Sequence, residues 1–488
     1  MKGFFPIAIA AMLAGARMTP PGAAIAEPPL QLEPYVLEGP DGARAEGELG
    51  TLLVPENRAR ADSREIPLRF VRLRSTAGRP GYPVVYLAGG PGGSAVRNGQ
   101  GVRFAFFNRL RQVGDVILLE QRGAGLSNTL PRCDLPAPDY SRPMDRSWFI
   151  ASYRSELSRC IAMWRAAGVD VAGYNTAESA RDLEDLRRAL GAEKLNLVGL
   201  SYGTHLGMAA LRSGLAVHRA AFAGLEGLDQ TVKLPAHFDA FFERVAASAR
   251  ADPQAAAAYP DLVALMRRVH ARLEREPAEA TVEGADGQPV RLRVGAFGVQ
   301  LITGYFFSSD PERLRDLPAF YAAMDGGDFS MTAMMLHRAF QSDFGRLDGM
   351  PQLMDIASGA SPGRLEQVAA QARTAVLGDA GNFPMPHVRD VAPELVLGED
   401  FRRGLATRVP TLLVMATMDG RTPIESQEEL LPQFRRATRL TVENGGHNIF
   451  EQSEAVQEEI VRFLREGRTA TNRVVLPPVR FRTLGAAR

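Results

Sequence analysis

The pentapeptide Gly199-Leu200-Ser201-Tyr202-Gly203 constrains the fold of this chain more than any other segment. It follows a short apolar run, 195–198, and precedes a helix-like stretch, 204–211. A serine between two glycines at a strand-to-helix turn is the pattern of a nucleophile elbow. The sharp turn strains the serine backbone and requires small neighbours, which the glycines supply. The pattern therefore predicts an open α/β sheet with Ser201 at its edge.

Short apolar runs typical of buried parallel strands alternate with helical patterns along the rest of the chain. The clearest helix is predicted at 176–190, with Asn175 as its N-cap and Glu178 three residues later. A first strand pair is predicted at 52–54 and 66–73, and further strands at 84–88, 116–119, 195–199, 220–223, 412–416 and 440–442. This alternation predicts an α/β class protein with a mostly parallel, doubly wound sheet.

The alternation stops at about residue 231, after the sixth predicted strand, and resumes near 406. Helices are predicted between these points at 238–250, 262–276, 311–324, 330–341 and 365–376, with a hairpin at 281–294. We therefore expect a helical insertion, 231–405, between two parts of one core domain, 27–230 and 406–467. Residues 27–46 are interpreted as a surface arm, and the basic tail 468–488 as a solvated segment.

The N-terminus has the pattern of a secretory signal peptide. Lys2 precedes an uncharged run, 3–16, and the segment ends in Ala24-Ile25-Ala26. A membrane anchor is the alternative, but the run is shorter than the roughly 18 to 20 residues that span a bilayer. We expect cleavage near Ala26 and a secreted or periplasmic protein, without stable membrane insertion. The formal net charge of +1 gives no reason to expect a nucleic-acid partner.

Only two cysteines are present, Cys133 and Cys160. In an exported chain such a pair favours one disulfide, and two buried free thiols are the alternative. The sequence shows no cluster of His, Cys, Asp and Glu at metal-ligand spacing, so we expect no metal or other cofactor.

A serine hydroxyl is a weak nucleophile that needs a base, and the base needs an orienting carboxylate. His447 lies in Asn444-Gly445-Gly446-His447, directly after the last predicted strand, whereas the other six histidines lie in helical or insertion contexts. Asp419 follows strand 412–416 and lies between Ser201 and His447 in chain order. Active-site groups collect in loops at the carboxyl ends of parallel strands. We therefore predict a Ser201–His447–Asp419 triad.

An oxyanion hole requires two backbone donors. One is expected from the N–H of Tyr202, and the other from the glycine-rich loop 89–94 after strand 84–88. A phosphate cradle is the rival interpretation of this loop, but the loop contains neither G-K-[ST] nor G-x-G-x-x-G.

Five motifs together resemble the proline iminopeptidase and tripeptidyl aminopeptidase family, which are serine exopeptidases of the α/β-hydrolase fold. They are A-G-G-P-G-G-S at 88–94, E-Q-R-G-A-G-L-S at 120–127, G-L-S-Y-G-T at 199–204, D-G-R-T-P at 419–423 and G-G-H at 445–447. The resemblance implies that the insertion is the family's helical cap. It also implies the same triad, with Gly90 and Tyr202 as oxyanion donors and Arg122 as a structural residue.

The length, the export signal and the cysteine pair resemble the secreted tripeptidyl-aminopeptidase branch more than the shorter cytosolic enzymes. Cytosolic proline iminopeptidases carry a Trp-Glu element in the cap, but the two tryptophans of this chain, Trp148 and Trp164, lie outside 231–405. The resemblance therefore does not extend to proline specificity.

An aminopeptidase must bind a free α-ammonium group, and a carboxylate near the site is the natural partner. Glu226 is the first candidate, because it follows strand 220–223 at the entry to the insertion; a surface or hinge glutamate is the alternative. The next candidates are Asp229, Asp343 and Asp355. We expect an exported serine aminopeptidase that acts on peptides with a free N-terminus. A carboxylesterase with the same triad and a non-catalytic binding scaffold are the alternatives.

Overall fold

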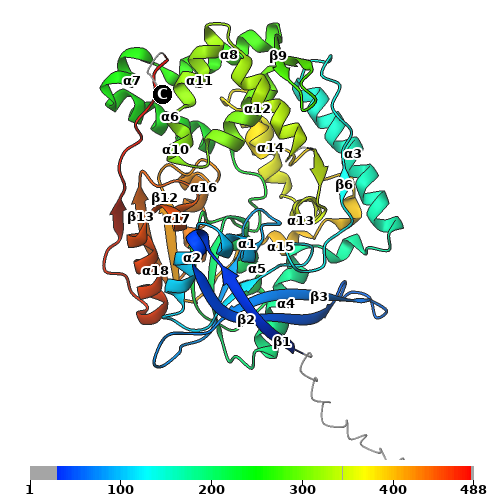
Figure 1. The fold of residues 1–488 in the computed structure, drawn as a ribbon, viewed down its shortest axis with the longest axis vertical. Coiled ribbons are helices and arrows are strands. Elements are labelled where there is room, and N and C mark those ends of the chain that lie inside the picture. Colours follow the sequence, from blue (N-terminus) through cyan, green and yellow to red (C-terminus); the bar gives the residue numbers. More distant parts are fainter. Residues whose placement is uncertain (1–29, 343–344, 485–488) are drawn as a thin grey trace, which may run out of the picture.

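A ten-stranded sheet forms the centre of the computed structural model, which describes residues 30–342 and 345–484 (Figure 1). The predicted signal peptide, 1–26, and Asp343 lie outside the described residues. The strand order is β1-β2-β3-β5-β4-β7-β8-β12-β13-β14, and the strands from β5 onward are parallel. Their bounds are β1 Leu30–Glu38, β2 Arg44–Pro55, β3 Glu65–Leu73, β4 Val84–Leu87, β5 Val116–Leu119, β7 Leu195–Leu200, β8 Val217–Ala223, β12 Thr411–Ala416, β13 Ala437–Glu443 and β14 Arg473–Val475.

The predicted mostly parallel sheet is confirmed, but the expected surface arm at 27–46 is wrong. Strand β1 lies in that segment and pairs antiparallel with β2 along its whole length. Most of its side chains remain exposed and Leu37 alone is buried, so the strand is held by backbone pairing at the sheet edge. Because of β1, the helical insertion follows the seventh strand of the sheet, β8, instead of the predicted sixth.

Helices cover both faces of the sheet, as the alternating pattern predicts. One face packs against α1 (Ala95–Gln100), α2 (Phe104–Leu110) and α18 (Glu454–Glu466). The other face packs against α4 (Thr176–Ala189) and α5 (Tyr202–Arg212). Asn175 caps α4 as predicted, since its side chain accepts a hydrogen bond from the Glu178 N–H.

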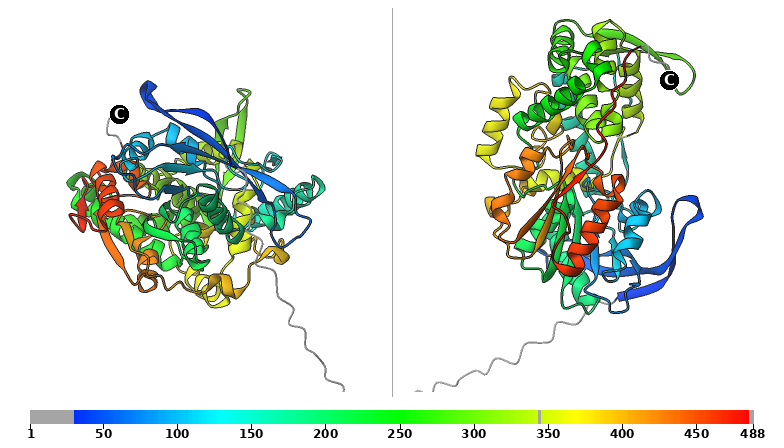
Figure 2. Two further views of the ribbon diagram at one scale, coloured as in Figure 1. Left: turned by 90° about the horizontal axis from the view of Figure 1, so that it is seen from below. Right: turned by 90° about the vertical axis from the view of Figure 1, so that its left-hand side faces the viewer.

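A second layer of helices stands over one end of the sheet (Figure 2). Its main part follows β8 and begins with α6 (Pro235–Ala251), and it has its own apolar core, which includes Phe241, Val245 and Tyr321. The predicted hairpin at 281–294 is present as β9 and β10. The elements that follow α6 before the chain returns to the sheet are α7 Pro253–Ala258, α8 Leu262–Arg275, β9 Ala278–Glu283, β10 Pro289–Val294, α9 Ala296–Ile302, α10 Pro311–Leu314, α11 Leu317–Asp325, α12 Ser330–Gln341, α13 Met350–Ser358, α14 Pro362–Ala372 and α15 Glu399–Arg402. Two short helices, α16 Ile424–Glu428 and α17 Ile449–Gln452, follow strands β12 and β13.

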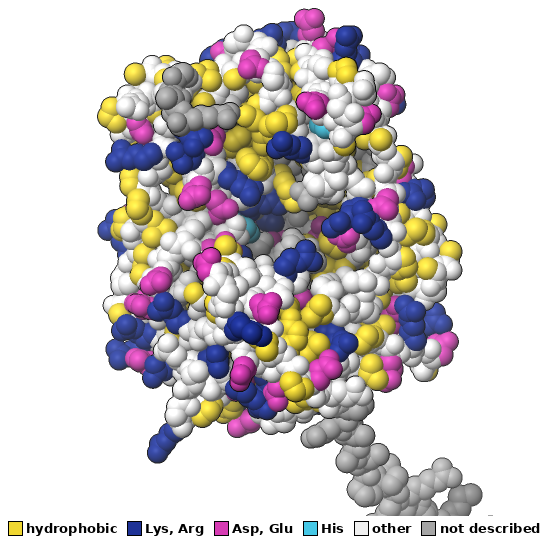
Figure 3. Space-filling model, in the orientation of Figure 1, with side chains coloured by type: hydrophobic (Ala, Val, Ile, Leu, Met, Phe, Trp, Pro, Cys, Tyr) yellow, Lys and Arg dark blue, Asp and Glu magenta, His cyan; other side chains and the backbone are white. Residues whose placement is uncertain are grey.

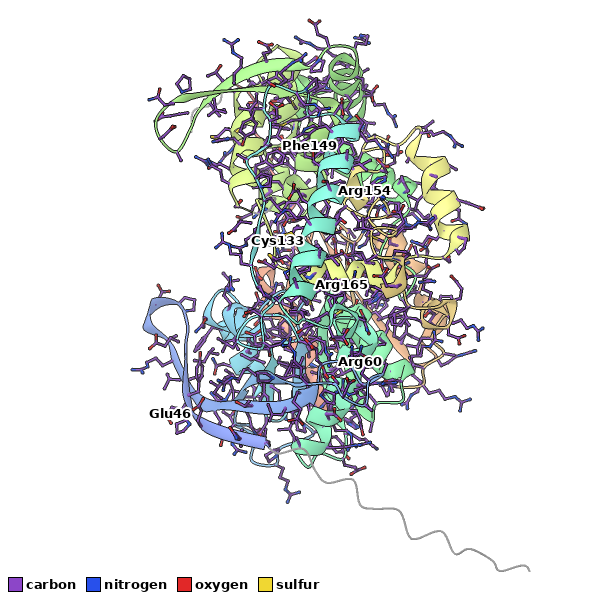
Figure 4. The ribbon with its side chains drawn as sticks, turned by 90° about the vertical axis from the view of Figure 1, so that its right-hand side faces the viewer. Glu46, Arg60, Cys133, Phe149, Arg154 and Arg165 are labelled. Carbon is purple, nitrogen blue, oxygen red and sulfur yellow. A yellow bond between two sulfur atoms is a disulfide. The ribbon has the colours of Figure 1, made fainter. Side chains whose placement is uncertain are left out.

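Helix α3 (Arg146–Ala166) belongs to this upper layer, although the sequence assigns it to the first part of the core domain. Its N-terminal half carries Trp148 and Phe149 into the upper apolar core, so that core does contain a tryptophan. Figure 4 shows α3 running from the level of the sheet into the upper layer, with Phe149 near its upper end. Hydrophobic periodicity predicts a buried face, and it does not say which core buries that face.

The predicted disulfide is confirmed: Cys160 of α3 is joined to Cys133, and their Cα atoms lie 5.8 Å apart. Cys133 lies in β6 (Cys133–Asp134), which pairs with β11 (Arg346–Leu347). The bridge therefore fastens α3 to β6, which in turn pairs with the strand that leads into α13.

The C-terminal segment is more than the solvated tail that its basic composition suggests. Strand β14 pairs with β13, and the chain then crosses to the upper layer (Figure 1). Val479 and Phe481 are buried in the upper apolar core. The Arg482 N–H donates to the Arg315 carbonyl. This C-terminal strap (473–484) thus connects the sheet edge to the helical layer. No helix in the described residues has the length and apolar character needed to cross a membrane.

Candidate functional site

Ser201 lies at the turn between β7 and α5 with φ 56° and ψ −129°, a backbone conformation that few non-glycine residues adopt. The neighbouring glycines are required by close packing. A Cβ on Gly203 would lie 2.0 Å from the Leu87 carbonyl oxygen, and one on Gly199 would lie 2.9 Å from the Gly203 oxygen. The local geometry is therefore that of a strained elbow, which lifts the Ser201 side chain above the sheet edge.

His447 and Asp419 form a hydrogen-bonded pair in the loops that follow β13 and β12. The His447 Nδ1 lies 3.0 Å from each carboxylate oxygen of Asp419. Asp419 is 1% exposed and also accepts hydrogen bonds from the backbone N–H groups of Arg421 and Thr422. Because a carboxylate in this setting accepts hydrogen bonds, Nδ1 carries the proton and Nε2 is left as the basic atom.

A cavity of about 610 Å³ between the sheet and the helical layer brings Ser201 and His447 together. Figure 3 shows this hollow from its open side, with a histidine on its wall and Lys and Arg side chains around it. No hydrogen bond joins the Ser201 hydroxyl to the His447 imidazole within the described residues. Such contacts are often longer before substrate is bound.

The glycine-rich loop after β4 forms one wall of the cavity, with Gly89, Gly90, Pro91 and Gly93. A Cβ on Gly89 would lie 2.7 Å from the Leu200 oxygen and 3.1 Å from the Ser201 Cβ. Only glycine therefore allows the loop to approach the serine so closely. Gly90 has φ 120°, which also favours glycine.

Two buried charged residues hold the loops around this wall. Glu120 accepts hydrogen bonds from the Ser94 hydroxyl at 2.5 Å and from the Ala95 N–H at 3.0 Å, and so anchors the end of the glycine-rich loop. Arg122 is fully buried and forms two hydrogen bonds with Asp182, at 2.6 and 2.7 Å. Neither lines the cavity, which fits the structural role that the resemblance implies for Arg122.

Glu226 does not lie on the cavity wall where we expected it. Its carboxylate oxygen lies 3.2 Å from the Lys233 ammonium, and both side chains are largely buried. Asp229 is also engaged, because it accepts hydrogen bonds from both the N–H and the hydroxyl of Ser361. The position of Glu226 after β8 is visible in the sequence, but its pairing with a lysine seven residues later is not.

Asp355 of α13 is the candidate acid that does line the cavity with Ser201 and His447. Burial, and to a lesser extent the nearby charge of Glu226, raises the pKa of Asp355 to about 7, while Lys233 acts in the opposite direction. Its side chain forms no ion pair or hydrogen bond within the described residues. It is therefore available to a ligand.

Asp355 is one of the four acids that the sequence suggests as partners of the substrate ammonium, and no feature of the sequence favours it over the other three. Helix α13 was not predicted, so its position over the serine could not be derived. Tyr153 of α3 and Gln352 of α13 border the cavity beside Asp355. Among the described residues, no group of three or more His, Cys, Asp or Glu side chains is arranged to hold a metal ion.

Comparison with known families agrees with this architecture. The model for the alpha/beta hydrolase fold matches residues 82–289, and the model described as TAP-like protein matches residues 396–475. A thermophilic esterase from Thermogutta terrifontis aligns with 86% of this chain and 99% of its own, at 16% identity and a TM-score of 0.37. That structural likeness is low, and the fold assignment comes from the sheet topology and the family model.

Two curated relatives are similar over part of the chain. The tripeptidyl aminopeptidase of Streptomyces lividans is 31% identical over 170 residues, which are 33% of this chain and 32% of the relative. The serine protease Hip1 of Mycobacterium tuberculosis is 30% identical over 224 residues, 41% of each chain. The matched regions thus span less than half the length of these relatives. The doubly wound sheet and these matches support a serine hydrolase of the TAP-like α/β-hydrolase family.

Proposed function

We propose that this protein is an exported serine aminopeptidase that releases residues from peptide N-termini through an acyl-enzyme on Ser201. The observation that carries the proposal is the cavity itself. It combines a serine on a strained elbow, a carboxylate-oriented histidine and one unpaired carboxyl group. The first two serve acyl transfer, and the third suits a substrate ammonium.

In the acylation step, the Ser201 Oγ attacks the scissile carbonyl carbon while the His447 Nε2 accepts the hydroxyl proton. Asp419 holds the imidazole in the required tautomer and stabilises the imidazolium. The N–H groups of Gly90 and Tyr202 donate to the carbonyl oxygen as it becomes negative. His447 then transfers the proton to the leaving amine, and water hydrolyses the acyl-enzyme by the same steps in reverse.

Asp355 replaces Glu226 as our candidate for the group that binds the substrate ammonium. The nearby Glu226 and Lys233 are paired with each other, which leaves Asp355 to the ammonium, and a bound ammonium favours the ionised form of a carboxyl group whose pKa is about 7 in the free enzyme. A charge-assisted hydrogen bond of this kind contributes roughly 1.5 to 3 kcal/mol. Binding the ammonium fixes how far the scissile bond lies from the N-terminus of the peptide. A simple esterase does not need this contact.

Export is supported by the N-terminal pattern and by the Cys133–Cys160 bridge, which is typical of oxidising compartments. Release of three residues per cleavage is the first possibility to test, because one of the relatives is named a tripeptidyl aminopeptidase.

An activity panel tests the proposal. Chromogenic amides of one, two and three residues, each with a free and with an acetylated N-terminus, are compared with a small acyl ester. We expect hydrolysis of the free amides, slow hydrolysis of the acetylated ones, and no turnover by Ser201→Ala. Rapid ester turnover without amide hydrolysis would instead identify a carboxylesterase.

A further inference from the structure

The wall of the cavity opposite Asp355 carries positive charge that the triad does not use. Arg313 and Arg421 both line the cavity together with Ser201 and His447. In Figure 1, α13, which carries Asp355, lies to the right of α10, which carries Arg313, and of α16, which begins three residues after Arg421. The cavity therefore has an acidic wall and a basic wall.

Arg421 is held in place without neutralisation of its charge. Its guanidinium donates to the Gly304 carbonyl at 3.2 Å and lies over the Tyr305 ring, 5.0 Å from the centroid. The nearby Asp419 carboxylate is directed at His447 and at backbone N–H groups. Within the described residues, Arg421 forms no ion pair with a carboxylate.

Arg313 repeats this arrangement at the rim of the cavity. Its guanidinium lies over the Phe306 ring, 4.4 Å from the centroid. Asp310 is occupied by Asn448 and Gln452, and the described part of the chain offers Arg313 no carboxylate partner within ion-pair distance. Stacking on an aromatic ring fixes the plane of a guanidinium and leaves its edge free for a bidentate acceptor.

The other arginines of the cavity are neutralised, which distinguishes them from this pair. Arg346 lies 3.2 Å from the Asp348 carboxylate, and Arg103 lies 2.7 Å from that of Glu451. Among the described residues that line the cavity, Arg313 and Arg421 are therefore the arginines without a carboxylate partner.

The direction in which a substrate peptide would lie in the cavity suggests a role for the wall that carries Arg313 and Arg421. If the N-terminal ammonium lies at Asp355 and the scissile carbonyl at Ser201, the leaving part of the peptide extends toward the opposite side. We propose, on the basis of the proposed function, that Arg421 and Arg313 bind a carboxylate on this leaving part. In the simplest case it is the free C-terminus, so the preferred substrates are short peptides held by both ends.

The test uses pairs of peptides of one sequence that end in a carboxylate or in a carboxamide. We expect wild-type enzyme to cleave the acid with a kcat/KM roughly 10- to 150-fold above that of the amide, the range for a charge-assisted hydrogen bond. Arg421→Gln should remove most of this preference by lowering kcat/KM for the acid alone. Arg313→Gln, at the rim, should lower it about 2- to 5-fold, as for an exposed ion pair.

Arg315→Gln is the matched control, because Arg315 follows Arg313 by two residues and shares an outer hollow with it, but does not line the cavity that holds Ser201. It should leave the ratio of acid to amide unchanged. A further peptide ends in an amidated glutamate, so its only carboxylate at that end is the side chain. Its kcat/KM shows whether the enzyme recognises a terminal carboxylate or a side-chain carboxylate.

Equal wild-type cleavage of acid and amide would overturn this proposal while leaving the aminopeptidase intact. An equal loss on both substrates in Arg421→Gln would also overturn it, because it would make Arg421 a framework residue. Failure to cleave any free-amine peptide would defeat the proposed function itself.

Discussion

Replacing Asp355 with asparagine should stabilise the protein in a pH-dependent way. The folded-state pKa of Asp355 is raised from its ordinary value near 3.8 to about 7. A carboxyl group with a raised pKa contributes stability that is fully present below pH 3.8 and is lost as the pH rises through 7. The difference between 3.8 and about 7 corresponds to about 4 kcal/mol above pH 7. Since the side chain borders a water-accessible cavity, we expect about 2 kcal/mol in practice.

Urea unfolding at pH 8 and pH 4.5 measures this effect. Asp355→Asn should unfold at a higher free energy than wild type at pH 8, and within about 1 kcal/mol of it at pH 4.5. Asp348→Asn is the control, since Asp348 borders the same cavity but is exposed and pairs with Arg346; its effect should stay within about 0.5 kcal/mol. A gain of equal size at both pH values, or a loss at pH 8, would refute the assignment of a costly buried carboxylate.

Three further predictions address the framework. Ser201→Ala should lower kcat by several orders of magnitude while circular dichroism and the melting temperature stay unchanged, because the elbow accepts a small side chain; a tenth of wild-type activity would exclude Ser201 as the nucleophile. Cys160→Ser should lower the free energy of unfolding by roughly 3 to 4 kcal/mol, measured against wild type with and without reductant; an unchanged value would mean that the bridge does not form. Phe481→Ala should cost roughly 3 kcal/mol in urea unfolding, because Phe481 fills the upper apolar core from the C-terminal strap; a neutral effect would mean that the strap does not hold the helical layer.

The parts of this structure that could be predicted are those with a local cause. The elbow at Ser201 needs glycines on both sides, and buried parallel strands such as β5 and β12 need short apolar runs. The disulfide follows from a cysteine count and a predicted compartment. Each of these inferences uses residues that are close in sequence or unique in the chain.

The parts that could not be predicted depend on contacts between distant segments. Strand β1 is mostly exposed at the sheet edge and is held by backbone pairing, so its side chains show no alternation of buried apolar and exposed polar residues. Helix α3 has a buried face, but its partner is a core assembled from residues far along the chain. The choice between Glu226 and Asp355 depends on whether Lys233 neutralises one of them, which only the fold decides.

Two residues of the cavity carry the proposed activity: Asp355 binds the free N-terminal ammonium of the substrate, and Ser201 attacks the scissile carbonyl carbon. The ratio of kcat/KM for a free-amine tripeptide amide to that for its N-acetylated form, in wild type and in Asp355→Asn, tests this claim most directly. We predict a preference of roughly 10- to 150-fold for the free amine in wild type, and a ratio near one in the variant. Equal rates on both substrates in wild type, or a preference that survives in Asp355→Asn, would contradict it.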